Sequence, residues 1–216
     1  MKKTLLIFLC CLFSVVLQAQ TEHLNFMGIP LDGKIKAFNK ELQKKGFVLD
    51  ELAGKMLDGT YIYNGIFAGE RAQVFVNYDR KTKVVYCAAA IIKCYSKEQA
   101  LGKYENMYDM LEEKYSHDEG VMFIENAYKK LKEHYGDTLE DRGVAPFEWK
   151  KREIEDDYEV ATFIIPNVEK GIKGDIRLFI SESYSNITHS TEYNLFVKYS
   201  DWQNDDSARD NRMDDL

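Results

Sequence analysis

Residues Val84–Cys94 read VVYCAAAIIKC, an almost unbroken run of β-branched and small apolar side chains. Successive side chains of a strand point to opposite faces of the sheet, so a run that is apolar at nearly every position is buried on both sides. The run therefore predicts a central strand, or a strand covered by a second layer. The small side chains of Cys87–Ala90 would let a helix approach this strand closely.

Further strand patterns lie on both sides of this run. Residues 60–63, 65–69 and 71–78 are rich in β-branched and aromatic side chains and are separated by turn residues. Such a pattern is typical of an antiparallel meander that ends in the apolar run. A second meander is predicted by four runs of alternating polarity, at residues 147–154, 158–165, 175–183 and 191–199.

Helices are predicted between these strands. One helix runs from Asp32 to Gly46, with apolar residues on one face and a glycine stop. A capping box at Ser96–Gln99 begins the first of two further helices, which a break at residues 117–120 separates. Because strands are grouped with strands and helices with helices, the pattern predicts an α+β fold rather than a parallel α/β sheet.

We expect one α+β domain over residues 20–200, with about seven or eight antiparallel strands and helices packed on one face. Its two halves, about 24–116 and 119–200, each read as a helix followed by a meander. Residues 201–216 carry six aspartates and little to bury. They are predicted to form a flexible acidic tail.

The start of the chain has the pattern of a secretory signal peptide. Two lysines precede an apolar stretch from Leu5 to Leu17, and the small residue Ala19 follows. Residues 1–19 are therefore predicted to be a signal peptide that is cut between Ala19 and Gln20. A transmembrane helix needs about 20 apolar residues, which makes an uncleaved anchor the weaker alternative. The expected location is the periplasm or the outside of the cell.

The four cysteines fall into two pairs. Cys10 and Cys11 lie inside the apolar stretch and follow large side chains, whereas lipid attachment needs a cysteine after small residues at the end of such a stretch; we expect no lipoprotein. Cys87 and Cys94 would lie roughly 23 Å apart along one strand, far beyond the about 7 Å that a disulfide spans. Both are therefore predicted to be unpaired thiols.

The charge balance limits the classes of partner. The formal net charge is −7, and removal of the leader with its two lysines makes it −9. Nucleic acids and anionic lipids bind to basic faces, so neither is expected as a partner. After the leader, no stretch is apolar for long enough to span a bilayer.

Motifs for catalysis are missing from the sequence. It contains no G-x-S-x-G, no G-x-G-x-x-G, no phosphate-binding loop and no H-E-x-x-H. The histidines His23, His117, His134 and His189 are too far apart in sequence to form a local zinc pair. We therefore expect no catalytic residue, no metal site and no cofactor.

These observations favour an exported, non-catalytic module that binds a protein or another envelope component. Aromatic residues of the first meander are the candidate contacts: Tyr61, Tyr63, Phe67 and Tyr78. Simple packing within the sheet is the alternative interpretation of these rings. A second functional hypothesis is a secreted or periplasmic hydrolase that acts on glycan or peptide through convergent carboxylates. The pattern does not predict an oligomeric state.

The segments Phe26–Gly33 and Gly65–Gly69, with the helix between them, resemble a group of uncharacterised exported bacterial proteins. At the level of the fold, the repeat of helix and meander resembles the β-lactamase-inhibitor-protein architecture and the small outer-membrane assembly lipoproteins, whose lipid-bearing cysteine this chain lacks. This resemblance implies a sheet whose open face grips a protein partner. It brings no catalytic residue with it.

Overall fold

The computed structural model describes residues 23–135, 148–155, 158–167, 171–185 and 189–213. Its helices are α2 (Ile35–Lys44), α3 (Glu51–Met56), α4 (Lys97–Ser116), α5 (Glu119–Tyr135) and α7 (Trp202–Met213). A short hairpin is formed by β1 (Asn25–Phe26) and β2 (Ile29–Pro30). The other strands are β3 (Val48–Leu49), β4 (Thr60–Phe67), β5 (Glu70–Tyr78), β6 (Val85–Cys94), β7 (Lys150–Glu155), β8 (Tyr158–Asn167), β9 (Gly171–Ser185) and β10 (Ser190–Asp201). The predicted signal peptide and its cleavage site at Ala19–Gln20 lie outside the described residues.

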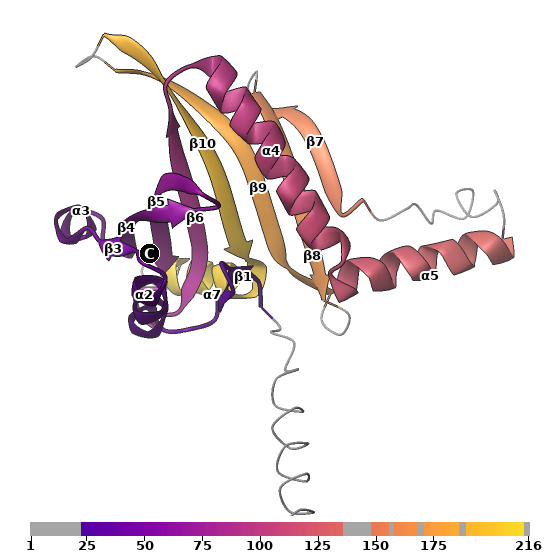
Figure 1. Cartoon of the computed structure of the whole chain (residues 1–216). Coiled ribbons are helices and arrows are strands. Elements are labelled where there is room, and N and C mark those ends of the chain that lie inside the picture. Colours follow the sequence, from indigo (N-terminus) through magenta and orange to yellow (C-terminus); the bar gives the residue numbers. More distant parts are fainter. Residues whose placement is uncertain (1–22, 136–147, 156–157, 168–170, 186–188, 214–216) are drawn as a thin grey trace, which may run out of the picture.

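One antiparallel sheet of eight strands organises the fold, in the order β3-β4-β5-β6-β10-β9-β8-β7 (Figure 1). The first meander supplies β3 to β6 and the second supplies β7 to β10, so the two meet where β6 pairs with β10. The predicted α+β class with two meanders is confirmed. The apolar run at residues 84–94 forms β6, one of the two central strands of the sheet.

Helix α4 covers one face of the sheet, which we call the inner face (Figure 1). Its start is fixed by the predicted cap, because the Ser96 hydroxyl accepts the backbone N–H of Gln99 at 3.2 Å. The helix packs against β6, β9 and β10. On β6 the inner face carries Ala88 and Ala90, both with 0% of their surface exposed. Small side chains at these positions leave room for the helix, as the sequence predicted.

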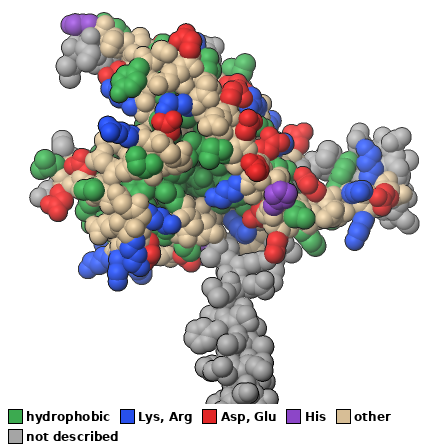
Figure 2. All heavy atoms as spheres, in the orientation of Figure 1, with side chains coloured by type: hydrophobic (Ala, Val, Ile, Leu, Met, Phe, Trp, Pro, Cys, Tyr) green, Lys and Arg blue, Asp and Glu red, His purple; other side chains and the backbone are tan. Residues whose placement is uncertain are grey.

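The rest of the inner face is covered by α2 and by the β1–β2 hairpin. The ring of Phe26 stacks on Phe67 at 5.5 Å and meets Tyr199 edge-on at 5.3 Å. Figure 2 shows this side of the molecule, where hydrophobic side chains gather in the middle between α4 and α2 and charged side chains surround them. The main hydrophobic core therefore lies between the inner face and these elements.

Residues 202–213 form a helix, which corrects the flexible tail predicted for this part of residues 201–216. Residues Trp202–Met213 form α7, which packs against β6, β9 and β10 and buries Ala208 completely. The buried Asp201 caps this helix, because its carboxylate accepts the backbone N–H of Asn204 at 3.0 Å. Acidic composition misled the prediction, because the buried Ala208, the cap and hydrogen bonds to distant residues together dock this polar helix. Residues 214–216 lie outside the described residues.

Helix α7 lies on the opposite side of the sheet from α4, behind its lower end in Figure 1. The indole N–H of Trp202 donates to Asp175 at 2.7 Å, and Asp175 pairs in register with Ser200. These residues share a face with Cys87, because Ser200 is the partner of Cys87 on β6. We call this second face, which also carries Ala89 and Ile91, the outer face. The prediction placed all helices on one face and did not include α7.

Helix α5 extends away from the sheet and contacts mainly the end of β8 (Figure 1). Met122 and Phe123 on this helix are 45% and 55% exposed. Within the described part of the chain, no helix combines the length and the apolar character needed to cross a membrane.

Gly174 determines how closely β9 and β10 approach at the point where α7 begins. It pairs in register with Asp201, and a Cβ atom at this position would overlap the carbonyl oxygen of Ser200. A side chain at residue 174 would therefore push apart the strands that hold Asp175 and Asp201.

We expect Gly174→Ala to lower the free energy of unfolding by about 1–3 kcal/mol, because the added methyl group forces a backbone shift. The control is Gly102→Ala in α4, where a Cβ meets nothing within 4 Å. That change should raise the free energy of unfolding by about 0.5–1 kcal/mol, since alanine is the better helix former. Urea denaturation of the three proteins measures both effects. Equal stability of the two variants would contradict the packing inferred for Gly174.

Candidate functional site

The outer face of the sheet contains a broad hollow of about 730 Å³. All the residues that line it come from four adjacent strands, β4, β5, β6 and β10. Helix α7 covers the other end of this face, around Cys87 and Ser200, and contributes no residue to the hollow. Among the residues that the structure describes, only the sheet therefore forms a wall of the hollow.

A row of apolar side chains leads from the hollow across the centre of the outer face. Strand register places Ile91 beside Phe196, and Phe196 beside Phe179. The two phenylalanine rings are stacked, with centroids 4.8 Å apart and planes 4° from parallel. We call Ile91, Phe196 and Phe179 the apolar strip. All three side chains are only partly buried, although they lie in the middle of an eight-stranded sheet.

Cations outnumber acids around the hollow and the apolar strip. Alternation along the strands places Arg71, Lys93, Arg177 and Lys198 on the outer face. Lys93 forms an ion pair with Glu192 at 2.9 Å. This local balance contrasts with the formal net charge of −7 for the whole chain. The outer face is thus more basic than the protein as a whole.

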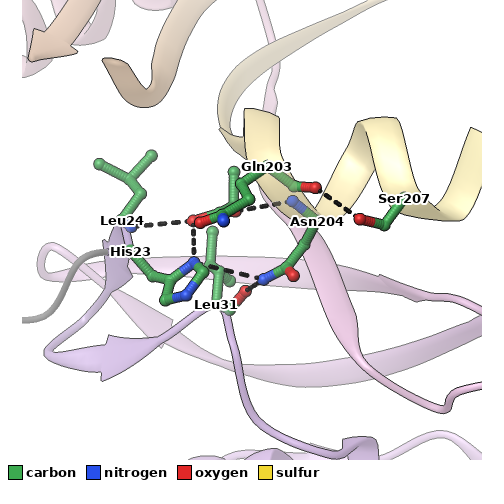
Figure 3. Close-up of polar contacts among 7 residues, drawn as sticks. His23, Leu24, Leu31, Gln203, Asn204 and Ser207 are labelled. Carbon is green, nitrogen blue, oxygen red and sulfur yellow. Dashed lines mark hydrogen bonds and ion pairs between the residues drawn. The ribbon is translucent and has the colours of Figure 1, made fainter. Parts of the chain in front are cut away.

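A second cluster of polar groups ties the start of the described chain to the start of α7 (Figure 3). The side chain of Asp201 is 0% exposed, and one of its oxygens lies 3.0 Å from Nδ1 of His23. The same oxygen accepts the backbone N–H of Leu24 at 3.1 Å. The side chain of Asn204 donates to the carbonyl of Leu31 at 2.7 Å. We call this cluster the terminal clasp.

The hydrogen bonds of Asp201 show that the terminal clasp has a structural role. Burial raises the pKa of Asp201, while hydrogen bonds from Asn204 and Leu24 and the nearby His23 oppose that shift. One oxygen of the carboxylate caps α7, and the other contacts His23 and Leu24 just before β1. A carboxylate bound in this way holds two segments together and is not available to a substrate.

The two buried carboxylates with raised pKa values do not form a catalytic pair. Burial raises the pKa of Asp175 as well, and this side chain accepts the hydrogen bond from Trp202. Asp175 lies on the outer face, whereas Asp201, one residue beyond Ser200, points to the opposite side. In the part of the chain that the structure describes, no group of three or more His, Cys, Asp or Glu side chains could hold a metal ion.

Of the four predicted contact residues, Tyr63 and Phe67 are only 0% and 5% exposed. Both side chains point to the inner face and belong to the core, so a partner at the surface cannot touch them. This corrects the prediction for these two rings in favour of sheet packing. Tyr61 and Tyr78 are partly buried, and their rings meet at 5.4 Å. A contact role for these two remains a prediction.

The thiols of Cys87 and Cys94 are both free and buried. They lie near the two ends of β6 and, because they are an odd number of residues apart, on opposite faces. Burial raises the pKa of the Cys87 thiol to about 11, and it also raises the pKa of Cys94. Both thiols are therefore protonated and unreactive near neutral pH.

Sequence reasoning missed Phe179 and Phe196. In these two strands the alternation of polarity indicates that residues such as Leu178 and Leu195 are buried. It assigns the positions between them, which include Phe179 and Phe196, to the polar face. A phenylalanine among polar residues, once in each strand, was the signal in the sequence that could have pointed to a binding surface. Only the strand pairing shows that the two rings stack on each other.

Comparisons of the chain with protein-family models, with curated proteins and with solved structures found no match. The resemblance to exported bacterial proteins and to the β-lactamase-inhibitor-protein architecture therefore stays a prediction.

We expect Asp201→Ala to lower the free energy of unfolding by about 2–3 kcal/mol, because it removes a helix cap and leaves the Leu24 N–H without its buried acceptor. His23→Ala should cost less, about 0.5–1.5 kcal/mol, since it leaves both backbone hydrogen bonds in place. Urea denaturation at constant pH gives both values. A larger loss for His23→Ala would show that the imidazole, and not the backbone, is the main partner of Asp201.

Proposed function

We propose that this protein is an exported, non-catalytic module that binds a partner protein through the outer face of its sheet. One observation carries the proposal: the hollow and the apolar strip lie side by side on a part of the sheet that α7 leaves open. Neighbouring apolar side chains that stay partly exposed on one surface are typical of an interaction site. A partner that covers this strip would bury the remaining aromatic surface.

The geometry favours a protein over a small molecule or a sugar. Small ligands usually bury most of their surface in a pocket, whereas the described residues that line this hollow all belong to the sheet. Sugars bind on the flat faces of aromatic rings. One face of each ring, Phe179 and Phe196, is already covered by the other ring.

The charges of the outer face indicate the chemistry of the partner. Arg71, Lys93, Arg177 and Lys198 surround the apolar strip, so a complementary surface carries an apolar projection with acidic groups around it. The resemblance to inhibitor proteins that grip a partner with an open sheet supports the same proposal. No described residue favours the alternative of a hydrolase with convergent carboxylates.

The double variant Phe179→Ser/Phe196→Ser should reduce capture of the partner from an envelope extract by at least tenfold, because it removes the centre of the contact. Phe123→Ser is the matched control, since that ring is 55% exposed on α5. Proteins retained by each tagged, exported protein are quantified by mass spectrometry, and circular dichroism checks the fold. The proposal fails if the double variant, still folded, retains the same proteins as the unaltered protein.

We also propose that the protein is periplasmic or extracellular and carries no lipid. Expression in a Gram-negative host should yield a product that begins at Gln20 and has the mass of residues 20–216 without an added group. Ala19→Arg should block the cut and leave the full-length precursor with the membrane fraction. N-terminal sequencing and intact mass of the fractionated protein measure both. A cytoplasmic product that keeps Met1 would contradict export.

A further inference from the structure

Arg71 is a cation in the hollow for which the described residues supply no partner. Its side chain is exposed and lines the hollow. The other cation there, Lys93, is already paired with Glu192. A guanidinium presents a planar fork of N–H donors that matches the two oxygens of a carboxylate. An arginine without a partner, in a chain of net charge −7, is thus available to bind an anionic group.

Three side-chain amides line the hollow with Arg71. Register places Asn64 beside Gln73, and Asn194 beside Lys93. Among the described residues, no side-chain hydrogen bond engages the amides of Asn64, Gln73 or Asn194. Each amide can donate two hydrogen bonds. The hollow therefore offers one unpaired positive charge together with several neutral donors.

The apolar lining lies beside this polar group. Ile66 pairs with Arg71 across the strands and is 53% exposed. Ile91 borders the hollow on the other side and continues into the apolar strip. A ligand that fits both features has an anionic group next to an apolar one, a few ångströms apart.

We infer that the hollow binds the C-terminal carboxylate of the partner protein, with the apolar side chain of that last residue on Ile66 and Ile91. This inference rests on the proposed function, because it names the chemistry that the outer face recognises. One unpaired arginine matches the single charge of a carboxylate through two parallel hydrogen bonds. A polyanion such as a nucleic acid would need many cations and would be repelled by the rest of the chain.

The test uses N-acetylphenylalanine as the probe and N-acetylphenylalanine amide as its neutral counterpart. Nuclear magnetic resonance of the ¹⁵N-labelled protein, purified after export, follows the Arg71 side chain and the amides of Asn64, Gln73 and Asn194. The acid should shift these signals with an affinity at least tenfold higher than that of the amide. Arg71→Gln should abolish this preference, and Arg71→Lys should keep part of it.

The control is Arg209→Gln on α7, which removes an exposed arginine outside the hollow and should leave the titration unchanged. Equal affinity for the acid and the amide, or a preference that survives Arg71→Gln, would overturn the inference.

The same variants distinguish this inference from the proposed function. If Phe179→Ser/Phe196→Ser loses the partner while Arg71→Gln keeps it and the probe shows no preference, the binding face stands and the carboxylate site is wrong. If the probe binds at Arg71 while the phenylalanine variant keeps the partner, the carboxylate chemistry stands and the hollow serves a ligand other than that protein.

Discussion

The pairing of β6 with β10 is the interaction on which the rest of the structure depends. It joins two meanders that lie far apart in sequence, and its register runs from Cys87–Ser200 to Cys94–Tyr193. Without it, each meander would have an exposed central edge and half of a core. With it, one sheet presents a continuous inner surface that α4, α2 and the β1–β2 hairpin can cover. The long sequence separation makes this pairing costly in chain entropy, which burial on both sides offsets.

The two faces of the sheet serve different purposes. The inner face carries the hydrophobic core, with side chains such as Val74, Leu178 and Val197 that are fully buried. The outer face carries partly exposed phenylalanines, unpaired amides and cations. Because alternate residues of each strand point to opposite faces, stability and binding can be assigned to separate sets of side chains. Residues on the part of the outer face that α7 leaves open can therefore vary in chemistry without loss of the core.

The end of the chain determines how much of the outer face stays open. Asp201 stops β10, caps α7 and holds Leu24 and His23 in the terminal clasp. The helix is thereby directed across one end of the outer face, over Asp175 and Cys87. Gly174 allows the close approach that this turn requires. The clasp thus connects both ends of the described chain to the border of the candidate binding surface.

The apolar run at residues 84–94, the capping box at Ser96 and the alternating strands were enough to predict the α+β class, the central strand and the two unpaired thiols. These features depend on the spacing of apolar residues and on composition, both of which can be read within a short stretch of sequence. The acidic segment after residue 200 was misjudged, because its helix packs on a surface that distant strands supply. The predicted contact residues Tyr63 and Phe67 were misjudged because their exposure also depends on distant segments. Strand periodicity shows which side chains share a face, but not which face a helix covers.

The sequence by itself therefore determined the main strands, the longer helices before residue 136, their order and the alternation of side chains along each strand. Only the tertiary structure decided that α4 covers the face of Tyr63 and Phe67, that α7 covers part of the other, and that Phe179 stacks on Phe196 beside the hollow of Arg71. The physical reason is that periodicity is a property of neighbouring residues. Exposure of a face, by contrast, depends on which distant segments pack against it.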